Sequence, residues 1–157
     1  MSDRIEKKMW EAMADSPFLM LHLQSTRDHA EPMTVQLDEN ADGAVWFYTT
    51  KDNRVADGGR AMAQFVSKDH KLFGCIAGTL TEETDPAVID KHWSRHVEAW
   101  YEGGRKDPNL LMMRFELGDA EIWTHDPTLK GRFKLMTGQE VSPEEVGDYE
   151  KTSLQSA

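Results

Sequence analysis

The chain has 157 residues, of which 39% are hydrophobic, and this suits one domain with its own core. Its 18 Lys and Arg against 28 Asp and Glu give a net charge of −10, which argues against nucleic acid and anionic membranes as partners, since both select a cationic surface. A single cysteine, Cys75, allows no internal disulfide, and no signal peptide or membrane-spanning apolar run is visible. These features predict a soluble, cytoplasmic protein.

The first third of the chain is predicted to hold one helix and three strands. Apolar residues at helical spacing predict a helix over 3–14. A buried strand is predicted over 18–25, an alternating strand over 32–37, and an aromatic-rich strand over 44–50. The polar segment 52–60 indicates one or two helical turns.

Two further strands are predicted over 61–67 and 72–83. Gly74 and Gly78 lie inside the second of these, where glycine is typical of a bulge or a tight bend. Cys75 between them is expected to be a small buried strand residue with no catalytic role.

The clearest helix is predicted from Pro86 to Glu102, with Asp85 as its N-cap and two glycines after its end. Its apolar residues recur at spacings of four, four and three, which predicts that Trp93 and Trp100 lie in the core. Trp10 is expected in the core as well. Two tryptophans lie on predicted strands, where core packing, a flat ligand or a second subunit would each explain them; they are Trp46 and Trp123.

Late strands are predicted over 110–117 and 120–125, followed by a short helix from Asp126 to about Thr137. From Gly138 onward the chain is acidic and poor in apolar residues, which predicts a mobile tail. The strands are joined mostly by short connections. They therefore predict a mainly β fold, a small antiparallel barrel with peripheral helices.

The sequence lacks the common catalytic and metal-binding motifs. His92 and His96 are spaced to lie on one face of a helix, but no third ligand accompanies them, so we expect no metal site. Neither a G-x-S-x-G, a G-x-G-x-x-G nor a phosphate-binding P-loop motif occurs. Catalytic residues therefore stay unassigned.

A group of hydroxyl, amide and cationic side chains follows the strand at 44–50. Its members are Thr49, Thr50, Lys51, Asn53 and Arg54. Hydroxyls, backbone N–H groups and cations at a strand end suit a bound anion. A solvated turn would have the same composition, so both interpretations stay open.

The order of four segments resembles the general-stress-protein branch of the pyridoxamine 5'-phosphate oxidase-like split barrels, over about residues 5–137. The segments are "PMTVQLD", "VWFYTTKDNRVADG", "GTLTEETDP" and "AWYEGGRKDPNLLMMRFELGDAEIWTHD". The resemblance implies a six-stranded antiparallel split β-barrel that forms a homodimer and binds FMN, with FAD as a further candidate, in two clefts between subunits. It implies a flavin-binding domain at 1–137 and an acidic C-terminal tail at 138–157.

The resemblance also implies which residues hold the cofactor. The strand at 32–36 would run along the isoalloxazine ring and ribityl chain, and the end of the next strand with its basic residues would hold the phosphate. The implied cofactor-binding residues are Pro32, Met33, Thr34, Gln36, Tyr48, Thr49, Thr50, Lys51, Arg54 and Trp123.

Three departures from the family pattern accompany these matches. Many members carry Arg where this chain has Glu31, and the oxidases proper carry Lys near the position of Gln36. Two phosphate-binding cations are thus missing, which implies modest affinity for the phosphate. After Trp123, "THDPTLKGRF" lacks the Arg-x-His element of the oxidases, so pyridoxamine-phosphate oxidation is not expected.

Three functions remain open at this point. One is a flavin-binding protein with low-specificity oxidoreductase activity, and the second is a non-enzymatic protein that binds or sequesters flavin in a stress response. The third is a binder of another flat anionic cofactor, such as a deazaflavin or haem.

Overall fold

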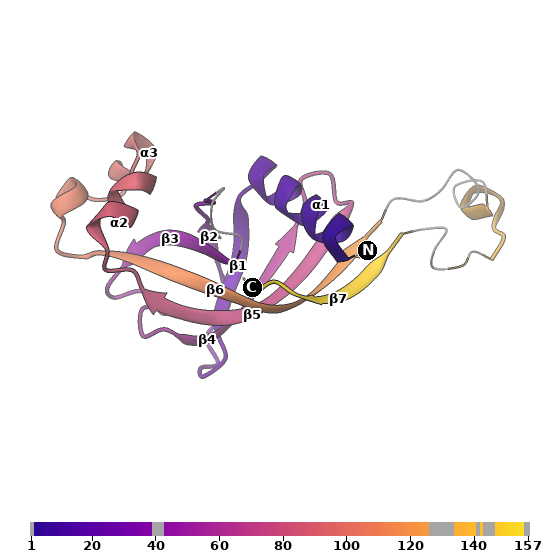
Figure 1. The fold of residues 1–157 in the computed structure, drawn as a ribbon, viewed down its shortest axis with the longest axis horizontal. Helices are drawn as coiled ribbons and strands as arrows, with labels where there is room; N and C mark the ends of the chain where they lie inside the picture. Colours follow the sequence, from indigo (N-terminus) through magenta and orange to yellow (C-terminus); the bar gives the residue numbers. More distant parts are fainter. Residues whose placement is uncertain (1, 39–42, 126–133, 141, 143–146, 156–157) are drawn as a thin grey trace.

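The computed structural model describes residues 2–38, 43–125, 134–140, 142 and 147–155, and its architecture is mainly β (Figure 1). The helices are α1 (Ser2–Asp15), α2 (Pro86–His92), α3 (Arg95–Glu98) and the 3-10 helix η1 (Gly104–Lys106). The strands are β1 (Phe18–Leu23), β2 (Glu31–Thr34), β3 (Ala44–Thr50), β4 (Gly59–Val66), β5 (Leu72–Glu82), β6 (Leu110–Thr124) and β7 (Tyr149–Ser153). Among the described helices, none has the length and apolar content needed to cross a membrane.

The strands form one antiparallel sheet in the order β2-β1-β4-β5-β6-β3, with β7 added beside β6. Within the described residues, the two ends of this order, β2 and β3, are joined by backbone hydrogen bonds only at a bridge between Trp46 and Gln36, which lies just beyond β2. The sheet therefore curls into a barrel that stays open beyond that bridge. This confirms the predicted antiparallel split barrel, but with seven strands in the described residues instead of six, because β7 joins the sheet.

The core fills the inner face of the barrel and continues under α1. Met9 and Met13 of α1 are fully buried against the sheet, as the helical spacing of apolar residues predicted. Phe47, Phe65 and Phe115 supply the largest fully buried rings, from three different strands. Burial of these side chains supplies most of the driving force for closing the sheet.

The strand β6 is one continuous element of 15 residues, where the sequence predicted two strands. Figure 1 shows it running the length of the molecule, with α2 and α3 near its start and β7 beside its end. Ile76 of β5 pairs with Ala120 and Gly78 pairs with Leu117, so one residue of β5 faces two of β6. This bulge bends the sheet where the sequence predicted a break, and it confirms the irregularity expected at Gly78.

The predicted helix from Pro86 to Glu102 is interrupted, so that prediction is wrong. Trp93 and Ser94 have extended backbones, and the Ser94 side chain accepts a hydrogen bond from Val97 N–H to start α3. No residue of α2 or α3 is buried, and Trp100 is 85% exposed. The residues with this apolar spacing form short helices on the outside of β3. Trp100 therefore does not reach the core.

Two other expectations about local structure are corrected. The segment after β3 forms successive turns instead of helix, with N–H groups of Asn53, Ala56 and Gly58 donating to the carbonyl three residues earlier. The predicted mobile tail contains β7, whose pairing with β6 satisfies the backbone polar groups on one of its edges despite few apolar residues. For the predicted helix at 126–137, residues 134–137 are helical and the start lies outside the described residues.

Candidate functional site

The barrel opens where β2 leaves β3, and this leaves one edge of β2 unpaired. Gln36 and Trp46 exchange two backbone hydrogen bonds, of 2.6 and 3.1 Å. Val35 N–H donates to the Pro17 carbonyl at 2.8 Å, so Val35 faces β1. Because backbone groups alternate in direction along an antiparallel strand, Thr34 directs its N–H and C=O away from β1. Beyond the bridge, these groups have no strand partner in the described part of the chain.

The predicted residues of β2 and β3 lie on the two sides of this opening. If the pairing of Gln36 with Trp46 continued, Thr34 would face Tyr48 and Pro32 would face Thr50. Pro32 and Thr34 are exposed, as an open edge requires. The structure therefore brings these residues to one place, although β2 and β3 pair with different neighbours in the sheet.

The far end of the opening is closed by a polar cluster that joins the start of β2 to the turn after β3. Arg54 Nε lies 3.2 Å from Glu31 Oε2, and Arg54 Nη1 donates to the His29 carbonyl at 3.0 Å. Asn53 Nδ2 donates to Glu31 Oε1. The predicted anion-binding residues Asn53 and Arg54 are therefore together, but both already bind a carboxylate of the same chain.

The remaining residues of that turn carry opposite charges. Thr50 Oγ1 donates to Asp52 Oδ1 at 2.6 Å, and this hydrogen bond is the main reason why the pKa of Asp52 is lowered. Lys51 is exposed and forms no ion pair within the described residues. Within the described residues, the turn therefore has one cation without an ion pair, Lys51, beside the Thr50 hydroxyl, which already donates a hydrogen bond.

Three predicted cofactor residues have side chains that are not free at this opening. Met33 and Thr49 are buried, and their backbones face the neighbouring strands, where the Thr49 carbonyl also accepts a hydrogen bond from the Tyr101 hydroxyl, so neither residue is directed at the opening. Tyr48 donates its hydroxyl to the Ile89 carbonyl at 2.6 Å, and burial raises its pKa to about 12, so it remains protonated at neutral pH. Tyr48 therefore fastens α2 to the outside of β3.

The helix α2 covers Trp46, which excludes it from contact with a ligand on the outer face. Trp46 is 3% exposed, its Nε1 donates to Glu83 at 2.9 Å, and its ring stacks on His92 with centroids 5.5 Å apart. Burial lowers the pKa of His92, so this imidazole is neutral at pH 7. Within the described residues, no three His, Cys, Asp or Glu side chains are grouped to hold a metal ion.

Trp123 lies far from the other predicted residues. Thr50 pairs with Leu110 at the start of β6, whereas Trp123 lies near the end of that strand. At about 3.3 Å per residue, β6 spans on the order of 40 Å between Leu110 and Trp123. Trp123 therefore cannot contact a flavin held at Thr50 of the same chain.

Trp123 belongs instead to a row of exposed apolar side chains on the outer face of the sheet. The registers place Val66, Phe73, Trp123 and Tyr149 opposite one another, and extending the pairing of β1 with β4 adds Phe18. These five side chains are between 39% and 56% exposed. This exposed apolar row was not predicted from the sequence, although alternation within each strand could have revealed outward apolar residues.

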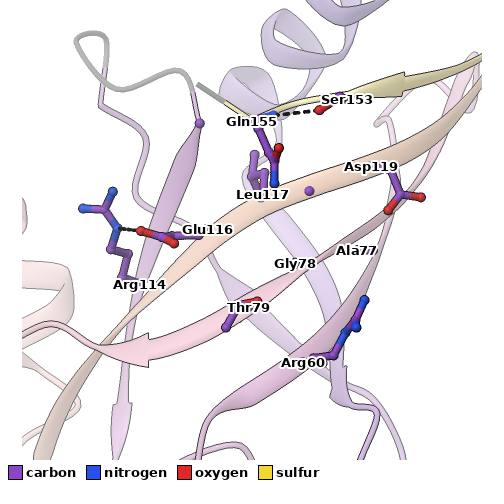
Figure 2. Close-up of a pocket in the computed structure, with 12 residues that line it drawn as sticks. Arg60, Ala77, Gly78, Thr79, Arg114, Glu116, Leu117, Asp119, Ser153 and Gln155 are labelled. Carbon is purple, nitrogen blue, oxygen red and sulfur yellow. Dashed lines mark hydrogen bonds and ion pairs between the residues drawn. The ribbon is translucent and has the colours of Figure 1, made fainter. Parts of the chain in front are cut away.

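A hollow of about 590 Å³ lies elsewhere on the sheet, at the bulge of β5 (Figure 2). Figure 2 shows Arg60 of β4, Thr79 of β5, Glu116 and Asp119 of β6 and Ser153 of β7 around it. None of the predicted cofactor residues lines it. Its lining contains two arginines and two acidic residues, and Glu116 already pairs with Arg114 at 3.2 Å. It therefore has no excess of positive charge to hold a phosphate.

Comparisons with known proteins agree with this architecture. Residues 4–140 match the family model described as pyridoxamine 5'-phosphate oxidase like. A general stress FMN/FAD binding protein from Xanthomonas citri is 41% identical, with a TM-score of 0.73 over 81% of this chain and 93% of that one. A general stress family protein from Xanthomonas campestris pv. campestris is 40% identical, with a TM-score of 0.74 over 82% and 92% of the chains.

A third solved structure covers nearly the whole chain. The protein described as general stress protein 26 from Jannaschia sp. CCS1 is 25% identical, with a TM-score of 0.78 over 98% of this chain and 99% of that one. No functionally curated protein matches the chain.

Proposed function

Because the chain belongs to the pyridoxamine 5'-phosphate oxidase-like family, in its general-stress-protein branch, we propose that it binds a flavin nucleotide. FMN is the first candidate and FAD the second. The ring would lie along the free edge of β2, with the ribityl chain directed toward the turn after β3. The observation that carries this proposal is the unpaired edge at Pro32 and Thr34, bordered by Tyr48 and Thr50 across the opening.

The free edge of β2 has hydrogen-bonding groups for part of an isoalloxazine ring. The pyrimidine side of that ring carries one N–H donor between two carbonyl acceptors. The Thr34 N–H can donate to one of these ring carbonyls while the Thr34 C=O accepts the ring N–H, and the second ring carbonyl needs a donor from outside this edge, because Pro32 has no N–H. A flavin would satisfy the two Thr34 groups as an added strand does. When bound, the ring itself supplies the redox chemistry.

The surroundings of this edge favour binding over turnover by the chain's own residues. Tyr48 is bonded to Ile89, and Arg54 and Glu31 are bonded to each other. None of these three is free to act as an acid or base toward a substrate. We therefore give a non-enzymatic role, in which the protein holds or sequesters flavin, equal standing with low-specificity oxidoreductase activity.

An absorbance spectrum of the purified protein, followed by titration with FMN, FAD and riboflavin, tests the proposal. A flavin spectrum, or quenching of flavin fluorescence at one ligand per chain, is the expected result. A haem or deazaflavin spectrum, or no binding, would overturn it. Adding a reduced nicotinamide nucleotide to the flavin-loaded protein then separates the two roles, because only an oxidoreductase would oxidise this nucleotide repeatedly.

We also propose that the protein acts as a cytoplasmic homodimer, in which the second copy covers the exposed apolar row. On one chain, Pro32 and Thr34 of the β2 edge are exposed and lie outside the hollow at the bulge of β5. Trp123 would reach a flavin only if it belonged to the partner, because it lies so far from Thr50 along β6. A stable dimer of this kind buries on the order of 2,000 Å².

Phe73 tests the dimer, since it lies at the centre of the exposed apolar row. Phe73→Asp should raise the dimer dissociation constant about tenfold, because it would bury a carboxylate in an apolar contact. Sedimentation equilibrium measures this constant. Trp100→Asp is the matched control: it removes a more exposed aromatic side chain outside the row and should change nothing. A wild-type monomer at micromolar concentration, or equal effects of both variants, would contradict the assignment.

A further inference from the structure

We propose that Glu31 sets the flavin preference of this protein. As a result, the protein binds riboflavin, which has no phosphate, about as well as FMN. The inference rests on the flavin site proposed above and specifies which flavins that site takes. It concerns the polar cluster formed by Glu31, Asn53 and Arg54, which closes the opening between β2 and the turn after β3.

The carboxylate of Glu31 occupies the donors that a phosphate would use. Its Oε2 lies 3.2 Å from Arg54 Nε, and its Oε1 accepts a hydrogen bond from Asn53 Nδ2. Cationic and amide donors converging on a two-oxygen anion are also the arrangement that binds a phosphate. Glu31 therefore acts as an internal anion, tethered to the strand along which the ligand would lie.

The local charge explains why this matters for ligand choice. Lys51 and Arg54 contribute two positive charges to the cluster and its turn, and Glu31, Asp52 and Asp57 contribute three negative charges. A phosphate dianion would have to displace Glu31 from Arg54 and would leave this carboxylate, whose side chain is only 23% exposed, without its partner. The terminal hydroxyl of riboflavin requires no displacement and can itself donate to a carboxylate oxygen.

The alternative is that the pair of Glu31 and Arg54 only fastens β2 to the turn after β3. In that case, breaking the pair would loosen the opening and weaken every flavin to the same degree. The two roles therefore differ in one measurable quantity, the ratio of the FMN and riboflavin dissociation constants.

The unmodified protein gives the first test. Titration by fluorescence quenching should show FMN and riboflavin binding within about tenfold of each other, with a ratio that changes little between low and high salt, because the cluster is close to neutral. A preference for FMN larger than this, falling steeply with salt, would overturn the inference while leaving the proposed flavin site intact.

Glu31→Gln gives the second test, because it keeps the shape of the side chain and removes the charge. FMN should bind about tenfold more tightly and riboflavin within about twofold of the original protein. The control is Glu116→Gln, which removes the same charge from an Arg–Glu pair of the same 3.2 Å separation at the other end of β3. It should change neither constant.

Each other outcome of this second test decides against the inference. If Glu31→Gln changed the dissociation constants of FMN and riboflavin equally, Glu31 would have a structural role only. If Glu31→Gln and Glu116→Gln raised the FMN affinity equally, the effect would come from the net charge of the protein. Thermal melts of the two variants show whether each is folded; if Glu31→Gln unfolds, the ratio in the unmodified protein decides. If no protein binds any flavin, the proposed function fails and this inference fails with it.

Discussion

Replacing Gly78 with alanine should lower the free energy of unfolding by about 3 kcal/mol. A Cβ at this position would lie 2.3 Å from the carbonyl oxygen of Glu116 and 2.5 Å from Cε1 of Phe115. Phe115 is fully buried, and the carbonyl oxygen of Glu116 is part of the backbone of the neighbouring strand β6 beside the bulge. Neither group can retreat without repacking the core or pulling β6 away from β5, so the cost should be large.

Gly74→Ala is the matched control, because Gly74 lies on the same strand. Its nearest neighbour would be Met9 Sδ at 4.0 Å, an ordinary contact with the end of a flexible side chain. The change there should stay within about 1 kcal/mol. Urea denaturation followed by far-UV circular dichroism measures both. Similar losses in the two variants would show that β5 tolerates no side chain at its glycines, and not that the bulge needs Gly78.

The strands could be predicted from the sequence because each carries its own signal. The apolar run in 18–25 and the aromatic run in 44–50 depend only on neighbouring residues, and both segments became strands. The helix from Pro86 failed for a physical reason: its apolar spacing was real, but the helix rests outside the barrel on β3. There a break at Trp93 costs little, since no core residue depends on it.

For the site, only the strands that carry the candidate residues could be predicted. Pro32 and Thr34 follow from the resemblance, and the structure adds that their backbone edge is unpaired. The partners of the side chains could not be predicted, because they are distant in the sequence. The bond of Tyr48 to Ile89 and the pair of Arg54 with Glu31 each join separate segments. For the same reason, the sequence grouped Trp123 with residues that lie at the opposite end of β6.

The second large effect is expected at Arg54. If the phosphate of FMN lies at the turn after β3, its hydrogen bond from Arg54 replaces the one that Arg54 gives to Glu31, so the two nearly cancel in the unmodified protein. Arg54→Ala leaves the carboxylate of Glu31 beside the incoming phosphate with no cation between them, a charge effect comparable to one charge-assisted hydrogen bond, roughly 1.5–3 kcal/mol. FMN should then bind about ten- to a hundredfold more weakly, at 1.4 kcal/mol per tenfold change. The loss should be larger at low salt.

Riboflavin is the control ligand for Arg54→Ala, because it has the same ring and no phosphate. Its affinity should change by less than about twofold, since it loses no ion pair. Thr50→Val should give the same pattern more weakly, because a neutral hydroxyl that already donates to Asp52 contributes less than a guanidinium. Combining Arg54→Ala with Glu31→Gln should recover part of the FMN affinity, since it restores the balance of charge at the turn. If Arg54→Ala weakened both flavins equally, the phosphate would lie elsewhere, with Lys51 and cations of a second subunit as the next residues to change.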